Sequence, residues 1–270
     1  MLSIHKYPRT QHIEGSRLQP GDEDLEAVPF EQIANRHLVV EEKMDGANCG
    51  ISFSQSGDLL LQSRGHFLTG GPREKHFTLF KQWAHTHTAA LHERLGSRYV
   101  LFGEWLYAKH TVFYDALPHY LMEFDVLDTE TSQFLSTPRR AELLERLPVV
   151  PVRVLHEGKL KGIKELTRLL GPSAFITPDH IRHLREKCEE QGIDPARVLR
   201  ETDRSTDMEG LYVKVEEDGV VTGRYKYIRP SFLTAVFAAE GHWLNRPIVP
   251  NLLREGADLF DVRQPGEHDA

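Results

Sequence analysis

The chain has 270 residues, enough for one large domain or two small ones. Its composition, 40% hydrophobic and 27% charged, is that of an ordinary globular protein. Its formal net charge of -7 argues against a domain that coats nucleic acid non-specifically, because such domains are usually basic. No apolar run approaches the ~20 residues of a membrane span, and the N-terminus lacks the apolar core of a signal peptide. We therefore expect a cytoplasmic protein without membrane contact. Its two cysteines, Cys49 and Cys188, predict no disulfide framework.

Residues 38–53 predict a strand, a tight turn and the start of a second strand. Apolar residues lead into Lys43, and Asp45-Gly46 supplies the turn signal. A lysine at a strand end is a candidate nucleophile once its ammonium loses a proton. Because a free lysine has a pKa near ~10.4, its surroundings must favour the neutral form or the transition state, which a nearby cation or partial burial could do. The alternative is a solvated lysine in a hairpin.

Two candidate polar residues follow in the next predicted elements. A hairpin over residues 51–63 ends just before Arg64, which could return to the mouth of the Lys43 site and bind phosphate. A helix is predicted for residues 75–95, and a buried strand for residues 98–106 carries Glu104. A buried carboxylate needs a partner, such as a ribose hydroxyl, a metal-bound water or Lys43. An ordinary salt bridge is the alternative for Glu104.

The middle of the chain alternates strand and helix patterns. In the predicted strand 119–128, the ring of Phe124 either stacks on a purine or packs in the core. Thr137 is the expected cap and Pro138 the first residue of a helix through residue 147. Residues 156–206 carry charged helical segments at 160–170, 178–191 and 195–201, which we interpret as a helical insertion. Its basic side chains form either a solvated face or a contact for a substrate backbone.

The last predicted strands, 208–215 and 220–227, form a hairpin. Glu209 begins its first strand, and Arg224 and Lys226 share one face of the second because side chains alternate along a strand. Two cations beside acidic residues from other strands are typical of a phosphate and metal site. A cross-strand charge ladder is the alternative. A further helix is expected at residues 232–240.

Six short elements occur in a fixed order: Lys43-Met44-Asp45-Gly46, Ser63-Arg64-Gly65, Phe102-Gly103-Glu104-Trp105, Glu123-Phe124-Asp125, Glu209 to Lys214, and Arg224-Tyr225-Lys226. This set resembles the covalent nucleotidyltransferase superfamily of DNA ligases, RNA ligases and capping enzymes, and within it most closely the RNA ligase 2 family. Asn48, two residues beyond Gly46, and the opening residues 6–10 favour that branch. The resemblance covers roughly residues 4 to 236.

The resemblance implies an α+β nucleotidyltransferase (ATP-grasp-like ligase) fold, with antiparallel sheets flanked by helices and a helical insertion. It implies an adenylyltransferase domain at residues 1–236 and a short C-terminal extension at 237–270. That tail is too short for the OB barrel that many ligases carry.

The resemblance also implies an ATP-dependent RNA ligase that uses Mg²⁺, with Mn²⁺ as a substitute. Its partners would be RNA, including a nicked RNA/DNA duplex, and an end-healing kinase or phosphatase. The implied catalytic residues are Lys43, Asp45, Glu209 and Lys226. The implied nucleotide-binding residues are Glu42, Lys43, Asn48, Arg64, Glu104, Phe124, Arg224 and Lys226, and the implied metal ligands are Glu209 and Glu104.

One residue departs from the family pattern. The last element usually carries two lysines separated by one residue, and here the first is Arg224. Arginine keeps the charge but stays protonated. If Lys226 contacts the α-phosphate, little is lost, whereas if Arg224 does, adenylation is slow.

Three other functions compete with the RNA ligase interpretation. A DNA ligase shares the Lys43 step, but Asn48 and the missing OB barrel weigh against it. A GTP-using capping enzyme would also carry an OB barrel. A nucleotide-binding module without catalysis would be expected to lack one of Lys43, Glu104, Glu209 or Lys226, and all four are present.

Overall fold

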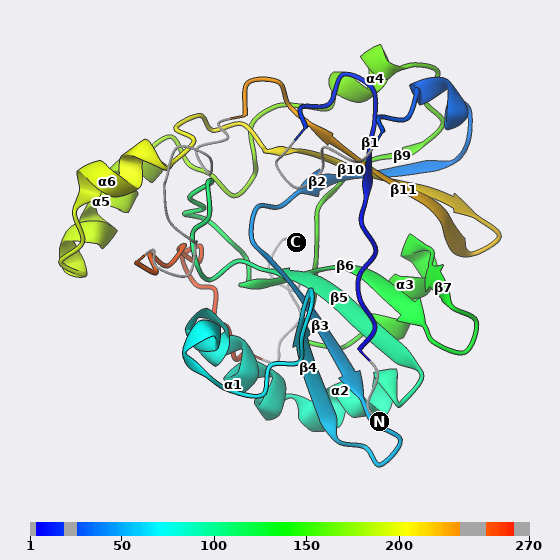
Figure 1. Ribbon diagram of the computed structural model, residues 1–270, viewed down its shortest axis with the longest axis horizontal. Coiled ribbons are helices and arrows are strands. Elements are labelled where there is room, and N and C mark those ends of the chain that lie inside the picture. Colours follow the sequence, from blue (N-terminus) through cyan, green and yellow to red (C-terminus); the bar gives the residue numbers. More distant parts are fainter. Residues whose placement is uncertain (1–3, 19–25, 233–246, 262–270) are drawn as a thin grey trace.

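The computed structural model describes residues 4–18, 26–232 and 247–261. They form a mixed α+β structure around one large sheet (Figure 1). The strands are β1 (Gln11–His12), β2 (Leu38–Lys43), β3 (Ala47–Phe53), β4 (Leu59–Ser63), β5 (Tyr99–Trp105), β6 (Leu121–Asp128), β7 (Gln133–Leu135), β8 (Val150–Pro151), β9 (Val154–Gly158), β10 (Gly210–Glu217) and β11 (Val220–Ile228). The helices are η1 (Phe30–Gln32), η2 (Pro72–Phe77), α1 (Thr78–Thr86), α2 (Thr88–Leu95), α3 (Thr137–Leu144), α4 (Ile163–Thr167), α5 (His180–Glu190) and α6 (Pro195–Arg200).

The sheet consists of two parts, here called wings, that are joined by β7. One wing contains β4, β3, β5 and β6, and the other contains β11, β10, β2 and β9. Its order is β4-β3-β5-β6-β7-β11-β10-β2-β9, with β8 added to β6 and β1 added to β11. All pairs along this order are antiparallel, and β8 and β1 add in parallel. The expected α+β architecture with a large antiparallel sheet is therefore confirmed, as is the final hairpin β10–β11.

The strands on either side of Lys43 do not pair with each other. Strand β2 pairs with β9 and β10, whereas β3 pairs with β4 and β5. The hairpin alternative for Lys43 is therefore wrong, because the turn after Lys43 carries the chain from one wing to the other. This crossing places the Lys43 turn between the two wings.

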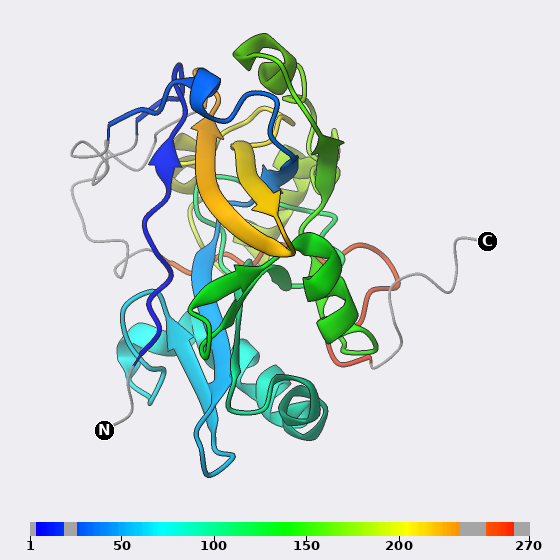
Figure 2. The ribbon, with the colours of Figure 1, turned by 90° about the vertical axis from the view of Figure 1, so that its right-hand side faces the viewer.

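The N-terminal segment from His5 to Ile13, here called the N-terminal arm, also contacts both wings. The amide of Ile13 donates to the Lys226 carbonyl on β11, and the side-chain amide of Gln62 on β4 donates to the His5 carbonyl. Figure 2 shows the arm running from β1 beside β11 down to the wing of β3 and β4. The arm thus ties the two wings together from outside.

The predicted helix at residues 75–95 is three shorter pieces. η2 precedes α1, and α1 ends at Thr86, one residue before His87. The hydroxyls of Thr86 and Thr88 donate to the carbonyls of Gln82 and Ala84. Such back-bonding competes with the helix ladder and bends helices, which accounts for the break.

The helix α3 begins one residue earlier than expected. Ser136, not Thr137, is its N-cap, and Pro138 follows in the first turn. The Thr137 hydroxyl donates instead to Glu216 on β10. A tertiary contact therefore replaces the predicted cap.

The expected insertion, residues 156–206, begins inside the sheet. Residues up to Gly158 belong to β9, which pairs with β2. α4 contributes Leu166 to the core under β2 and β10. α5 and α6 project from one end of the molecule (Figure 1).

The C-terminal residues 247–261 return to the cores. Leu259 is buried with α1, α2 and β3, and Val249 is buried with α5 and α6. The expected helix at 232–240 and the proposed boundary at residue 236 fall largely outside the described residues, so both stay predictions. In the part of the chain that the structure describes, no helix has the length and hydropathy needed to cross a bilayer.

Candidate active site

Lys43 ends β2 and faces a carboxylate that lies just before β10. Its Nζ lies 2.7 Å and 2.8 Å from the two carboxylate oxygens of Glu209. The Lys43 side chain is 22% exposed and that of Glu209 only 1%. In the register of β2 and β10, Lys43 lies opposite Gly210, the residue after Glu209. The lysine side chain is therefore partly exposed, while its carboxylate partner is buried.

The environment of Lys43 raises the pKa of its amine. Burial lowers this pKa. Glu209 raises it through its charge and its hydrogen bonds, Glu104 and Asp45 raise it through their charges, and together they outweigh burial. We expected a nearby cation or partial burial to favour the neutral form; burial does act in that direction, but the carboxylates outweigh it, and the net shift is upward. The carboxylates keep Lys43 an ammonium until their charge is balanced by something else.

Glu104 and Asn48 lie opposite each other on β5 and β3, on the same face. Burial raises the pKa of Glu104 to about 8. The charge of Lys43 lowers this pKa, whereas the charges of Glu209 and Asp45 raise it further. The amide of Gly46 donates a hydrogen bond to the Glu104 carboxylate. The side-chain oxygen of Asn48 is buried and has no hydrogen-bond partner. An acceptor left open in this way is costly unless a ligand supplies a donor.

The side chain of Asp45 forms hydrogen bonds with the loop between β5 and β6. Its Oδ2 accepts hydrogen bonds of 2.7 Å from the amides of Thr111 and Val112. Its own amide donates to the Tyr114 hydroxyl at 2.9 Å. The geometry thus makes Asp45 an anchor of the turn after Lys43.

Gly46 is required by a close approach to β5. A Cβ at this position would lie 2.8 Å from the Trp105 carbonyl oxygen and 2.8 Å from Leu106. Only glycine lets the turn come this close to the strand that carries Glu104.

Lys226 and Arg224 occupy different surroundings although they share a face of β11. Lys226 lies opposite Tyr212 on β10, the residue that in turn lies opposite Glu41 on β2. The guanidinium of Arg224 lies 3.8 Å from the ring centroid of Phe134 and 5.6 Å from that of Tyr7. The arginine therefore stacks on aromatic rings, while its Nη1 is buried without a hydrogen-bond partner, so both cations stay candidates for a phosphate.

Phe124 belongs to a group of aromatic side chains that also contains Tyr7 and Tyr212. Its half-buried ring lies 5.1 Å from the ring of Tyr7 and 6.2 Å from that of Tyr212. Tyr7 donates from its hydroxyl to Asp125 and lies 2.5 Å from the Tyr212 hydroxyl. Phe124 has both core contacts and an open part, so the two expectations for it remain open.

Two predicted residues make no described contact with the cluster formed by Lys43, Asp45, Glu104 and Glu209. Glu42 alternates with Lys43 along β2, so its side chain points to the opposite face, where it is 1% exposed. Burial raises the pKa of Glu42 to about 7, and the neighbouring Ser173, the charge of Arg153 and the backbone of Ala174 oppose this rise. The expectation that the Glu42 side chain contacts the nucleotide is therefore not supported. Arg64 lies exposed just beyond the Cys49–Ser63 pair of β3 and β4.

A buried ion network beside the cluster was missed from sequence. Lys214 Nζ lies 2.9 Å from Glu41 Oε2 and 3.4 Å from Asp125 Oδ1. Arg140 adds a 2.8 Å ion pair to Glu41 and a 3.3 Å ion pair to Glu123. Alternation along β10 could have found Lys214, since it shares a face with Tyr212.

The carboxylates can hold a hydrated divalent cation, although they form no closed cage. Among the described residues there is no group of three or more His, Cys, Asp or Glu arranged to hold a metal. Mg²⁺ is commonly held by one or two carboxylates plus substrate phosphates, and it keeps several waters. Glu104 and Glu209 fit that description, because each, when ionised, adds negative charge near Lys43 that a cation would relieve.

A family model described as RNA ligase matches residues 36–228, well over half of the chain. The chain belongs to the RNA ligase family, a group of covalent nucleotidyltransferases. The matched segment of this RNA ligase family member contains every one of the predicted site residues from Glu42 to Lys226. No curated protein sequence matches the chain.

Solved structures of Naegleria gruberi RNA ligase share the fold of this RNA ligase family chain. A mutant with ATP and Mn has a TM-score of 0.53 at 16% identity, covering 85% of this chain and 57% of that one. The protein with PPi has a TM-score of 0.52 at 16% identity, covering 83% and 56%. A mutant with AMP and Mn has a TM-score of 0.52 at 15% identity, covering 83% and 56%. The chain thus spans little more than half the length of these structures.

Proposed function

We propose that this chain is an ATP-dependent RNA ligase of the RNA ligase 2 type, which joins a 5′-phosphate to a 3′-hydroxyl through a lysyl-AMP intermediate on Lys43. The observation that carries the proposal is the contact of the Lys43 amine with both oxygens of Glu209. A partly exposed amine beside buried carboxylates suits a nucleophile that meets a triphosphate and a divalent cation. The structures with ATP, AMP and Mn belong to the Naegleria protein and are consistent with such ligands here.

In the first proposed step, the Lys43 amine must leave Glu209 and lose a proton. Its nitrogen then attacks the α-phosphorus of ATP, the bond from that phosphorus to the bridging oxygen breaks, and pyrophosphate leaves. Lys226 is proposed to hold the α-phosphate through its charge. A divalent cation bound at Glu104 and Glu209 would supply positive charge to the phosphates.

In the second step, a 5′-phosphate oxygen of RNA attacks the phosphorus bound to Lys43. The phosphorus–nitrogen bond breaks, and AMP passes to the RNA end. In the third step, a 3′-hydroxyl loses its proton and attacks the activated 5′-phosphorus, and AMP leaves. Catalysis of such transfers is mostly positioning and neutralisation of charge, which the fixed side chains around Lys43 can supply.

Other side chains have proposed roles in binding ATP. Glu104 and Asn48 present two acceptors on one face, suited to the ribose hydroxyls and to later steps on RNA. Phe124 is proposed to stack on adenine. Arg64, at the end of β4, is proposed to reach a phosphate.

The deciding experiment is an intact-mass measurement after incubation with ATP and Mg²⁺. The wild-type protein should gain the mass of one AMP. Lys43→Ala should lose the adduct and melt at the same temperature as wild type, while Lys161→Ala, at an exposed lysine, should keep the adduct. An adduct that persists in Lys43→Ala would show that this lysine is not the nucleophile.

Two substitutions of substrate separate the related activities. Labelled GTP in place of ATP should give no adduct, which distinguishes the ligase from a capping enzyme. Nicks with RNA on the 3′-hydroxyl side should be sealed faster than all-DNA nicks. Equal sealing of both would favour a DNA ligase.

A further inference from the structure

A long loop between β5 and β6, residues 106–120, grips the turn that follows Lys43. Three hydrogen bonds join the two segments: from the amides of Thr111 and Val112 to Asp45, and from the amide of Asp45 to the Tyr114 hydroxyl. Because Asp45 is only two residues from the Lys43 amine, a shift of this loop would move the amine.

This loop contains no helix or named strand, so other parts of the chain must hold it. Loops of this length are usually functional and lose much conformational entropy when ordered. On one side, the buried Asn251 accepts from the amide of Tyr114 and donates to the Leu106 carbonyl. That contact fixes the start and the middle of the loop.

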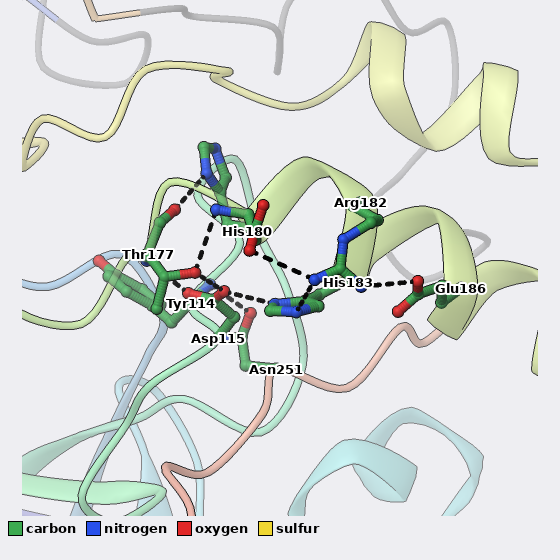
Figure 3. Close-up of polar contacts among 9 residues, drawn as sticks. Tyr114, Asp115, Thr177, His180, Arg182, His183, Glu186 and Asn251 are labelled. Atoms are coloured by element: carbon green, nitrogen blue, oxygen red, sulfur yellow. Dashed lines mark hydrogen bonds and ion pairs between the residues drawn. The ribbon is translucent and has the colours of Figure 1, made fainter.

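On the other side, the segment leading into α5 holds Asp115, the residue after Tyr114. The Asp115 side chain is fully buried and accepts three hydrogen bonds. Two come from Thr177, through its amide and its hydroxyl, and the third comes from the Nδ1 of His183 at 2.7 Å. Figure 3 shows the carboxylate of Asp115 between Thr177 and the His183 ring.

The second nitrogen of His183 is also engaged. Its Nε2 lies 3.0 Å from Nη2 of Arg182, a guanidinium that can only donate. A neutral ring that carries its proton on Nδ1 therefore satisfies both contacts at once. Arg182 is held in turn by Glu186, 2.9 Å away on the next turn of α5 (Figure 3).

We propose that Asp115, Thr177 and His183 are positioning residues for the Lys43 amine, acting through the loop that grips Asp45. The inference rests on the proposed adenylation of Lys43. None of the three needs to touch the nucleotide. They hold Tyr114 and the amides of Thr111 and Val112 where these can fix the turn after Lys43.

Loss of the His183 contact should act on the chemical step rather than on ATP binding. Removing one donor leaves the buried Asp115 carboxylate partly unsatisfied, so the loop can relax away from the turn. A displacement of the reacting amine by about 1 Å can slow a reaction by up to about 100-fold. The groups proposed to bind ATP, on β5, β6 and β11, are held by strand pairing of β5 with β3 and β6 and of β11 with β10.

The test compares His183→Ala with His183→Asn and with Glu186→Ala. The amide of Asn can replace the Nδ1 donor toward Asp115, so it is the conservative rescue. Glu186 lies on the same helix and pairs with Arg182 but does not contact Asp115, so it is the matched control. Melting temperatures of all three report on the fold.

Two reactions are measured for each variant. The first is the rate of lysyl-AMP formation across a range of ATP concentrations. The second is sealing of an RNA that already carries AMP on its 5′ end, in which Lys43 is not the nucleophile. We expect His183→Ala to lower the saturated rate of lysyl-AMP formation about tenfold, with little change in the ATP concentration for half-maximal rate and in sealing of the adenylated RNA. His183→Asn should recover most of that rate, and Glu186→Ala should match wild type.

Equal losses in both reactions, or no loss in either, would overturn the positioning role. A loss in His183→Asn as large as in His183→Ala would overturn it as well. If wild type itself forms no adduct, the proposed function fails, and that outcome is distinct from failure of the positioning role.

Discussion

Lys43 on β2 lies directly opposite Gly210 on β10, and a Cβ at position 210 would come within 2.1 Å of the Tyr227 carbonyl oxygen on β11. No backbone oxygen can be approached so closely, so any side chain at position 210 must push β10 and β11 apart. The same displacement would move Glu209, the partner of the Lys43 amine.

Gly210→Ala should therefore destabilise the protein and slow adduct formation together. Forcing atoms into a packed site costs typically about 1–3 kcal/mol. Chemical denaturation and the intact-mass assay check the two effects. Gly171→Ala is the control, because a Cβ there meets no atom within 4 Å. Normal stability in Gly210→Ala would contradict the close approach.

Lys226 and Arg224 should differ in what their loss does. Lys226→Ala should lose most lysyl-AMP formation, because it removes the cation proposed for the α-phosphate. Arg224→Ala should keep the adduct and lose about 1 kcal/mol of stability, since its guanidinium stacks on Phe134. Adduct formation and urea unfolding are measured on both variants. The reverse pattern would assign the α-phosphate to Arg224.

Phe124→Ala should raise the ATP requirement more than it lowers the maximal rate. Stacking of a base on an aromatic ring contributes about 1–3 kcal/mol, which corresponds to about a 5- to 150-fold change in half-saturating ATP. An ATP titration of adduct formation measures this. Phe53→Leu, in the core beside α2, should leave the titration unchanged. If Phe124→Ala also leaves it unchanged, Phe124 is a core residue only.

The requirement for divalent metal should fall as pH rises from 7 to 8. The pKa of Glu104 is raised to about 8, so its carboxyl is mostly protonated at pH 7, and only the ionised form binds a cation. The apparent metal affinity should therefore increase up to about tenfold per pH unit below 8 and level off above it. Metal titrations of adduct formation at several pH values test the slope. Glu104→Gln should give a weaker and flat dependence, and a flat dependence in wild type would remove Glu104 from the metal site.

Lys214→Ala should be among the more destabilising substitutions. Lys214 is 1% exposed and its ammonium lies between Glu41 and Asp125, so its removal takes a cation from a buried cluster in which Glu41 keeps only its ion pair with Arg140 among the described contacts. Breaking a buried ion pair in this way costs about 3–5 kcal/mol. Unfolding is measured without ATP. The control Lys187→Ala breaks an exposed pair with Glu190, which is worth about 0–1 kcal/mol. Similar losses in both variants would contradict the assigned burial.

The sequence by itself determined the hairpin β10–β11, most of the strands and the residues that meet at Lys43, because these depend on local periodicity and on ordered motifs. It could not determine that β2 and β3 part into different wings, since strand pairing is a long-range choice among many edges. It also could not show that Glu42 is buried on the face of β2 opposite Lys43, or that Arg224 stacks on Phe134 and Tyr7, because those partners lie far apart along the chain. The tertiary structure decided as well that Asp45 is held by residues 111–114, and that Thr177 and His183 hold Asp115 beside them. Such contacts arise only where packing and buried hydrogen bonds bring distant segments together, and no local pattern encodes them.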